Sequence, residues 1–136
     1  MSEAGFAVEV AGGVPVVTTP EEIDIGNAPG LRAALRSAAA HGRGPVVVDM
    51  SRTQFCDSAG LHVLIRAHKR AKAEGDDVLV VICATAVLRI FAISGLDCII
   101  PNFSSLEEAL AQASPTESAN SSSAPTAPEP DPVPFP

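Results

Sequence analysis

Short apolar runs alternate with longer amphipathic stretches along the chain, and this alternation predicts a mixture of strands and helices. Two strands are expected at 6–10 and 14–18, and the turn Ala11-Gly12-Gly13 between them indicates a hairpin. Apolar runs rich in β-branched residues predict the remaining strands, at 45–50, 78–83 and 98–100.

Apolar positions at helical spacing predict four helices, and polar or small residues mark their ends. The segment 21–26 is expected to be a loop, because Pro20 has no N–H for the ladder and ends the second strand. Helices and strands therefore alternate after the hairpin, which predicts an α/β fold: a small mixed β-sheet with flanking helices. The expected helices begin near Asn27, at Asp57 or Ser58, at Thr85, and at Ser104 or Ser105, and the first three end at His41-Gly42, Gly75 and Gly95.

Composition changes sharply near residue 114, which divides the chain into a domain at 1–113 and a tail at 114–136. The tail holds seven of the twelve prolines and almost no aliphatic side chains, so it cannot bury enough surface to offset its ordering entropy. We expect a disordered segment that keeps the protein in solution. Recruitment of a partner by its proline-rich end is the alternative.

The charge balance and the cysteine pattern exclude several functional classes. A net charge of −7 argues against direct nucleic-acid binding and fits the electrostatic selection of a protein partner. No apolar run approaches the length of about 18 residues that indicates a membrane span, and residues 1–5 do not resemble a signal peptide. Cys56, Cys83 and Cys98 lack metal-ligand spacing and lie in apolar surroundings at the ends of expected strands. We therefore expect reduced thiols, no metal or other cofactor, and a cytoplasmic location, with Cys56 as a small buried apolar side chain.

The segment 55–61 is the main candidate for a functional site, because it joins a buried strand to a helix. Ser58 stands where the helix dipole and unpaired N–H groups favour negative charge, and the small residues Ala59 and Gly60 leave its hydroxyl open. Asp24 lies in another loop that we expect at the same edge of the sheet, where ligands bind in α/β folds. This arrangement suits a phosphate group that is added and removed.

Three simpler interpretations compete with a phosphorylation site. Ser58 can serve only as a helix cap, and Asp24 can likewise only cap the first helix. A hydrolase is disfavoured, because the residue two before Ser58 is Cys56 rather than the glycine of a nucleophile elbow, and His62 is not placed like a triad base. The basic residues at 66–72 are expected to form a solvated helix face rather than a binding patch.

The motif Asp57-Ser58-Ala59-Gly60-Leu61, after the strand 46–50, resembles the signature of STAS domains, and most closely the stand-alone anti-sigma factor antagonists of bacteria. Supporting matches are Glu22-Ile23-Asp24 with Asn27-Ala28, and the segments 87–91 and 94–97. The likeness covers residues 5–113. One departure is Pro20-Glu21-Glu22, where the family usually has a glycine before its Glu-Ile-Asp motif.

This resemblance implies a regulatory binding protein rather than an enzyme. In that family the unphosphorylated antagonist binds an anti-sigma factor, a serine kinase of the histidine-kinase-like fold, and frees a sigma factor. Phosphorylation of the serine that matches Ser58 abolishes binding, and a serine phosphatase reverses it. The alternative is a non-switching STAS subunit of a larger signalling or lipid-transport assembly. The residues that the resemblance assigns to partner binding are Asp24, Asn27, Asp57, Ser58, Ala59 and Gly60.

Overall fold

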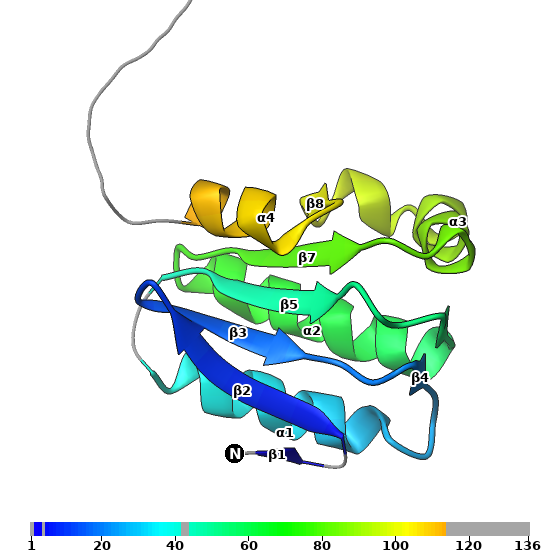
Figure 1. The fold of residues 1–136 in the computed structure, drawn as a ribbon, viewed down its shortest axis with the longest axis horizontal. Helices are drawn as coiled ribbons and strands as arrows, with labels where there is room; N and C mark the ends of the chain where they lie inside the picture. The colour runs from blue at the N-terminus through cyan, green and yellow to red at the C-terminus, as the bar shows by residue number, and fades with distance from the viewer. Residues whose placement is uncertain (1, 4, 42–43, 114–136) are drawn as a thin grey trace, which may run out of the picture.

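The computed structural model describes residues 2–3, 5–41 and 44–113, which form a six-stranded sheet, a separate two-stranded pair and four α-helices (Figure 1). The tail expected at 114–136 lies outside the described residues. The strands are β1 (Ser2–Glu3), β2 (Phe6–Ala11), β3 (Val14–Thr18), β4 (Glu22–Ile23), β5 (Val46–Met50), β6 (Phe55–Cys56), β7 (Val78–Ile82) and β8 (Asn102–Phe103). The helices are α1 (Ala28–Ala39), α2 (Ser58–Ala73), α3 (Thr85–Ser94) and α4 (Leu106–Ala113), with a short 3-10 helix, η1 (Leu96–Cys98).

The main sheet is mixed, with the strand order β1-β2-β3-β5-β7-β8. Strands β1, β2 and β3 are antiparallel, and β2 and β3 form the predicted hairpin across Gly12 and Gly13, which both have positive φ angles. Strands β3, β5, β7 and β8 run parallel, and α1, α2 and α3 occupy the connections between them. The predicted fold class, α/β with a small mixed sheet, is therefore confirmed.

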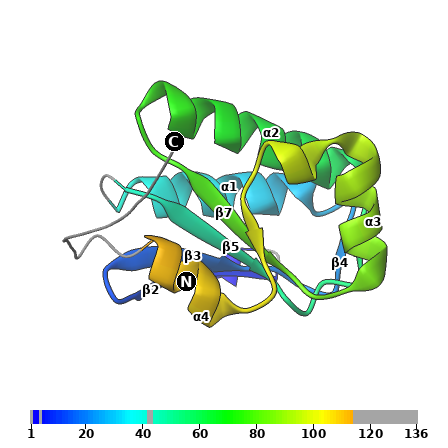
Figure 2. The ribbon, with the colours of Figure 1, turned by 90° about the horizontal axis from the view of Figure 1, so that it is seen from above.

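Helices cover both faces of the sheet, as the view from above shows (Figure 2). Along β5 and β7 the side chains alternate between two cores, because successive residues of a strand point to opposite faces. Val48 and Val80 join the core under α1, α2 and α3, whereas Val47 and Val81 join the core under α4. The continuous apolar runs of these two strands follow from this burial on both faces.

Three predicted details of secondary structure are wrong. Residues 98–100 are not a strand: η1 ends at Cys98, and the strand β8 begins after Pro101, whose carbonyl oxygen accepts from Val80 N–H at 3.0 Å. The predicted loop at 21–26 contains the strand β4, which pairs in parallel with β6. Thr85 is the first residue of α3 rather than its cap, since Ala84 holds the capping position without a side-chain hydrogen bond.

The capping residues of the last helix follow the sequence pattern closely. The hydroxyl of Ser105 accepts from the N–H of Glu108 at 3.2 Å, and the carboxylate of Glu108 accepts from the N–H of Ser104 at 3.2 Å. This is a capping box in which the carboxylate of Glu108 binds the N–H of Ser104, one residue before the capping residue Ser105. It fixes the start of α4 on the face of the sheet opposite α1 and α2 (Figure 2).

A buried pair of threonine hydroxyls connects the sheet to the loops that carry the candidate site. The side chains of Thr19 and Thr53 are 1% and 0% exposed, and their hydroxyl oxygens lie 2.5 Å apart. The hydroxyl of Thr53 donates to the carbonyl oxygen of Pro20 at 2.6 Å. Because buried polar groups must be paired, these contacts hold the segment after β3 against the segment after β5.

We expect Thr53→Val to lower the free energy of unfolding by about 1–3 kcal/mol, because it removes the buried hydroxyl that pairs with Thr19 and donates to Pro20. Urea denaturation followed by circular dichroism measures this. As a control, the double variant Thr19→Val/Thr53→Val should cost less than the sum of the two single variants, since the hydroxyls share one network. Strict additivity of the two substitutions would contradict the proposed coupling.

Candidate functional site

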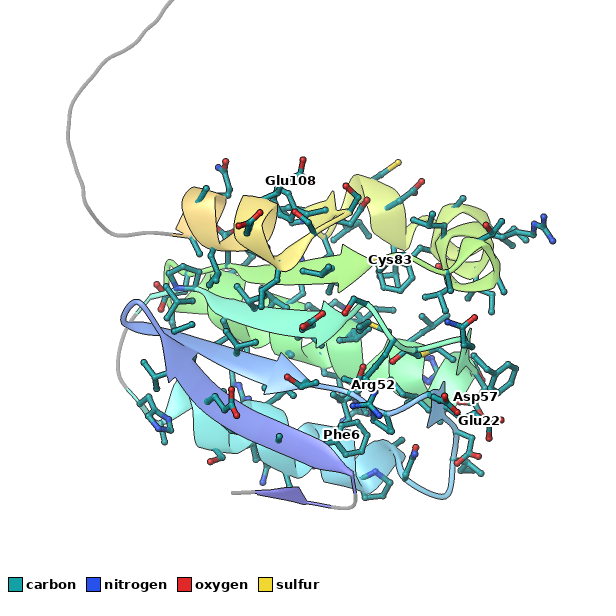
Figure 3. The ribbon with its side chains drawn as sticks, in the orientation of Figure 1. Phe6, Glu22, Arg52, Asp57, Cys83 and Glu108 are labelled. Carbon is teal, nitrogen blue, oxygen red and sulfur yellow. The ribbon has the colours of Figure 1, made fainter. Side chains whose placement is uncertain are left out.

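The candidate site lies at one edge of the sheet, where the parallel strands end. The chain leaves β3 into β4 and α1, leaves β5 into β6 and α2, and leaves β7 into α3, so three helices begin at this edge (Figure 1). Asp57 and Glu22 are found together there (Figure 3). The register of β4 and β6 pairs Glu22 with Phe55 and Ile23 with Cys56, which places the Asp24 loop beside the start of α2.

Asp57 is the residue that organises this edge. Its Oδ1 atom accepts from the backbone N–H groups of Ala59 at 2.9 Å and Gly60 at 3.3 Å, so it caps α2. Its Oδ2 atom accepts from the N–H of Ile25 at 3.2 Å, in a loop that lies 32 residues earlier in the chain. One carboxylate therefore begins the helix and holds the neighbouring loop against it.

Ser58 is the first residue of α2, and its side chain is exposed. Within the described part of the chain its hydroxyl makes no hydrogen bond. The sequence left open whether Asp57 or Ser58 caps the helix, and the structure gives that role to Asp57. The hydroxyl of Ser58 is thus accessible from solvent and is not needed to begin the helix.

The Asp24 loop is braced by its own polar side chains. The carboxylate of Asp24 accepts from the N–H groups of Gly26 at 2.9 Å and Asn27 at 3.3 Å. The amide of Asn27 accepts from the N–H of Asp24 at 2.9 Å and donates to the carbonyl oxygen of Glu22 at 2.8 Å. Asn27 precedes α1 but makes no side-chain cap bond to it, so its role is to shape the loop.

Gly60 is buried under the first turn of α2, where there is no space for a side chain. A Cβ atom at this position would lie 2.7 Å from the Sγ atom of Cys56 and 2.7 Å from a methyl carbon of Ile23. The glycine therefore lets α2 approach β4 and β6 closely. Of the six residues that the resemblance assigns to partner binding, Gly60 is buried in this packing, whereas Ser58 is exposed.

The three cysteines do not share one environment. Cys56 is fully buried, and desolvation together with the charge of Asp57 raises the pKa of its thiol to about 12. It stays protonated at neutral pH and packs as a small apolar side chain. Cys83 and Cys98 are exposed, and Cys98 lies in η1, so the expectation that it stands at the end of a strand is wrong.

Exposed apolar side chains surround the start of α2, and the sequence analysis did not single them out. Ile25, at the tip of the Asp24 loop, is 79% exposed, and Phe55, in β6, is 46% exposed. Both lie beside acidic residues that belong to the same two segments, notably Glu22 and Asp57. A surface that is both apolar and acidic is suited to contact with another protein. The sequence did contain one signal for this surface, which is that Ile25 is an apolar residue within a polar loop.

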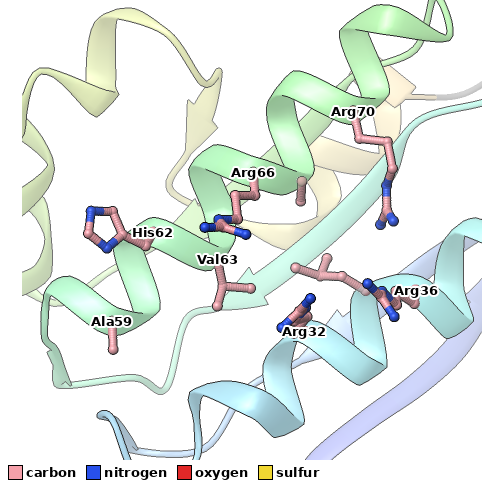
Figure 4. Close-up of a pocket in the computed structure, with 9 residues that line it drawn as sticks. Arg32, Arg36, Ala59, His62, Val63, Arg66 and Arg70 are labelled. Carbon is pink, nitrogen blue, oxygen red and sulfur yellow. The ribbon is translucent and has the colours of Figure 1, made fainter.

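A groove of about 540 Å³ runs between α1 and α2 and starts at Ala59, the residue after Ser58 (Figure 4). Four arginines line it, Arg32 and Arg36 from α1 and Arg66 and Arg70 from α2. The predicted solvated face at 66–72 is therefore divided, because only two of its basic side chains face the groove. In the described ranges the one ion pair joins Lys72 to Asp77 at 2.7 Å, so none of these arginines has a carboxylate partner there.

The arrangement does not favour enzymatic chemistry at Ser58. His62 follows one helical turn later and is exposed, and no hydrogen bond between described residues joins it to Ser58. No cluster of three or more potential metal-ligating side chains is found among residues 2–3, 5–41 and 44–113. Within the same part of the chain, none of the helices has the length and apolar character needed to cross a membrane.

Comparison with known proteins identifies the family. The family model of the STAS domain matches residues 6–109, and the chain belongs to this family. It is similar to the crystal structure of an anti-sigma factor antagonist from Mycobacterium paratuberculosis, with a TM-score of 0.73 and 30% sequence identity over 83% of this chain and 98% of that one.

Two more distant structures share the fold. The Bacillus cell fate determinant SpoIIAA in its phosphorylated form has a TM-score of 0.61 at 21% identity, over 79% of this chain and 97% of that one. The murine Solute Carrier 26 family member A9 anion transporter has a TM-score of 0.62 at 21% identity, over 77% of this chain and 18% of that one. The fold therefore occurs both as a small separate protein and as part of a transporter.

We expect Asp57→Asn to separate the two roles of this side chain. Asparagine caps helices about as well as aspartate, but its amide nitrogen would face the N–H of Ile25 as a second donor. Hydrogen exchange measured by NMR should therefore accelerate at Ile25 and change little at Ala59. In the control variant Asp57→Ala, both amides should lose protection. Unchanged exchange at Ile25 in Asp57→Asn would contradict the role of Asp57 in holding the loop.

The close packing at Gly60 gives a second prediction. Gly60→Ala should lower the free energy of unfolding by about 1–3 kcal/mol, because the new methyl group overlaps Cys56 and Ile23. The same substitution made in a Cys56→Ala background should cost less, since the sulfur atom is absent. Urea unfolding of the four proteins measures the difference, and an equal cost in both backgrounds would rule out the clash with Cys56 as a cause.

Proposed function

We propose that this protein is an anti-sigma factor antagonist controlled by phosphorylation of Ser58. In its unphosphorylated form it binds an anti-sigma factor that is also a serine kinase, and a sigma factor is released. Phosphorylation by that kinase ends the interaction, and a serine phosphatase restores it. The 30% identical antagonist, which aligns along nearly its whole length, supports this class of function.

The accessibility of the Ser58 hydroxyl is the observation that carries the proposal. A serine that capped α2 would be committed to the fold, but here Asp57 makes the capping contacts and Ser58 stays exposed. Exposed apolar contact area is provided nearby by Ile25, whose N–H donates to Asp57, and by Phe55 in β6. A partner that covers these side chains would also bury the hydroxyl.

The electrostatics at this edge explain how a phosphate would oppose binding. Phosphorylation adds a charge of about −1.5 to −2. The backbone N–H groups of Ala59 and Gly60 already donate to Asp57, so they are not available to neutralise the new phosphate. A partner that approaches Ser58 would then have to desolvate a phosphate beside a carboxylate. A penalty of about 3 kcal/mol would weaken binding about a hundredfold, without any change of conformation.

A non-switching STAS subunit of a larger assembly is the alternative function. It uses the same fold and the same edge but needs no phosphate at Ser58. The two functions differ in one observable, which is the phosphorylation state of Ser58 in the cell.

We expect a Ser58 phosphopeptide when the protein is isolated from its own host and digested for mass spectrometry. Ser58→Ala should lose this phosphopeptide, keep the wild-type melting temperature, and bind the anti-sigma factor constitutively. Ser58→Asp should bind at least about tenfold more weakly, because it places a charge in the contact.

Thr85→Asp is a matched control, because Thr85 is exposed and is the first residue of the neighbouring helix α3 at the same edge. It should change binding much less than Ser58→Asp. If Ser58 is never phosphorylated across growth and stress conditions, the switch is refuted and the non-switching subunit is favoured. Equal weakening by the two aspartates would indicate a general charge effect instead.

A further inference from the structure

The groove between α1 and α2 concentrates positive charge in a chain that is acidic as a whole. It contains four of the nine lysine and arginine residues, whereas the net charge is −7. Figure 4 shows Arg32 and Arg36 extending from α1 and Arg66 and Arg70 extending from α2 toward the same space. No aspartate or glutamate lines the groove.

This arrangement opposes folding rather than supporting it. Arg32 and Arg36 are four residues apart on one helix, as are Arg66 and Arg70 on the other, and like charges at this spacing repel. The two rows also face each other across the groove. None of the four forms an ion pair with a carboxylate in the described ranges, so an external anion would relieve the repulsion.

The shape of the groove indicates which kind of anion it suits. The charges form two rows instead of converging on one point, with a spacing of about 6 Å along each helix. From Ala59 to Arg70 the groove follows α2 for about 16 Å, or three helical turns. Its floor includes apolar side chains, Leu35, Val63 and Ala67. A single phosphate group would use only part of such a surface.

We propose that this groove binds an acidic amphipathic helix of a protein partner. A helix that carries glutamate or aspartate four residues apart repeats its charges at the same spacing as the arginine rows. Its apolar side would cover Leu35, Val63 and Ala67, in the manner of a helix docked in a groove. The groove begins next to Ser58, so we assign the helix to the anti-sigma factor whose binding depends on Ser58. This assignment rests on the proposed function.

The proposal is tested first without that partner. The probe is a synthetic helical peptide with leucines on one side, flanked by glutamates four residues apart, titrated into the full-length ¹⁵N-labelled protein. Amide shifts should concentrate at 32–36 and 59–70, and added salt should weaken binding. A peptide of the same length with glutamine in place of glutamate should bind at least about tenfold more weakly.

Variants of α2 provide the matched comparison. Arg66→Glu/Arg70→Glu should weaken binding of the acidic peptide by at least about tenfold. Lys69→Glu on the same helix is exposed but does not line the groove, so it should change binding by less than about twofold. Arg66→Gln should leave the melting temperature unchanged or raise it, since it removes one repelling charge.

The outcomes separate this inference from the proposed function. If the peptide fails to bind, or binds the double arginine variant as well as the wild type, the groove is not a helix-docking site. The same holds if pyrophosphate binds through these arginines and the peptide does not, or if Arg66→Gln lowers the melting temperature. If Ser58 is never phosphorylated but the peptide binds with the expected arginine dependence, the switch fails and the docking groove stands.

Discussion

The carboxylate of Asp57 is the contact on which the geometry of the candidate site depends. One of its oxygen atoms begins α2, and the other holds the N–H of Ile25, so two segments far apart in the sequence are aligned by one side chain. The short pairing of β4 with β6 and the packing of Gly60 against Cys56 and Ile23 reinforce the same alignment. The edge is therefore positioned by a few short hydrogen bonds together with the main core, because Ile23 and Cys56 are both part of that core.

Much of the fold was accessible from the sequence, because its signals are local. The alternation of β5 and β7 between two cores requires nearly continuous apolar runs, and such runs are easily recognised. The glycine turn of the β2–β3 hairpin and the capping box of α4 likewise depend on a few adjacent residues. The position of Ser58 at the start of a helix also followed from a local strand-to-helix transition.

The parts that could not be predicted depend on contacts between distant segments. Strands β4 and β6 contain two residues each, too few to show a period, and they exist because two loops meet at one edge. The sequence predicts that Pro101 ends a strand at 98–100, whereas in the structure Pro101 precedes β8, and its carbonyl oxygen accepts a hydrogen bond from the N–H of Val80 in β7. The arginine groove required knowledge that α1 and α2 lie side by side, since each helix alone shows only a basic face.

The division of labour between Asp57 and Ser58 has a consequence for how this protein can evolve. Because Asp57 caps α2, the fold depends little on which residue occupies the next position, 58. A lineage can replace Ser58, and so lose the proposed phosphorylation site, while it keeps an intact domain with the same contact surface. The reverse change is equally accessible, since one substitution at an exposed helix start restores a hydroxyl. The proposed phosphorylation site at Ser58 and the helix cap at Asp57 can therefore change independently in evolution.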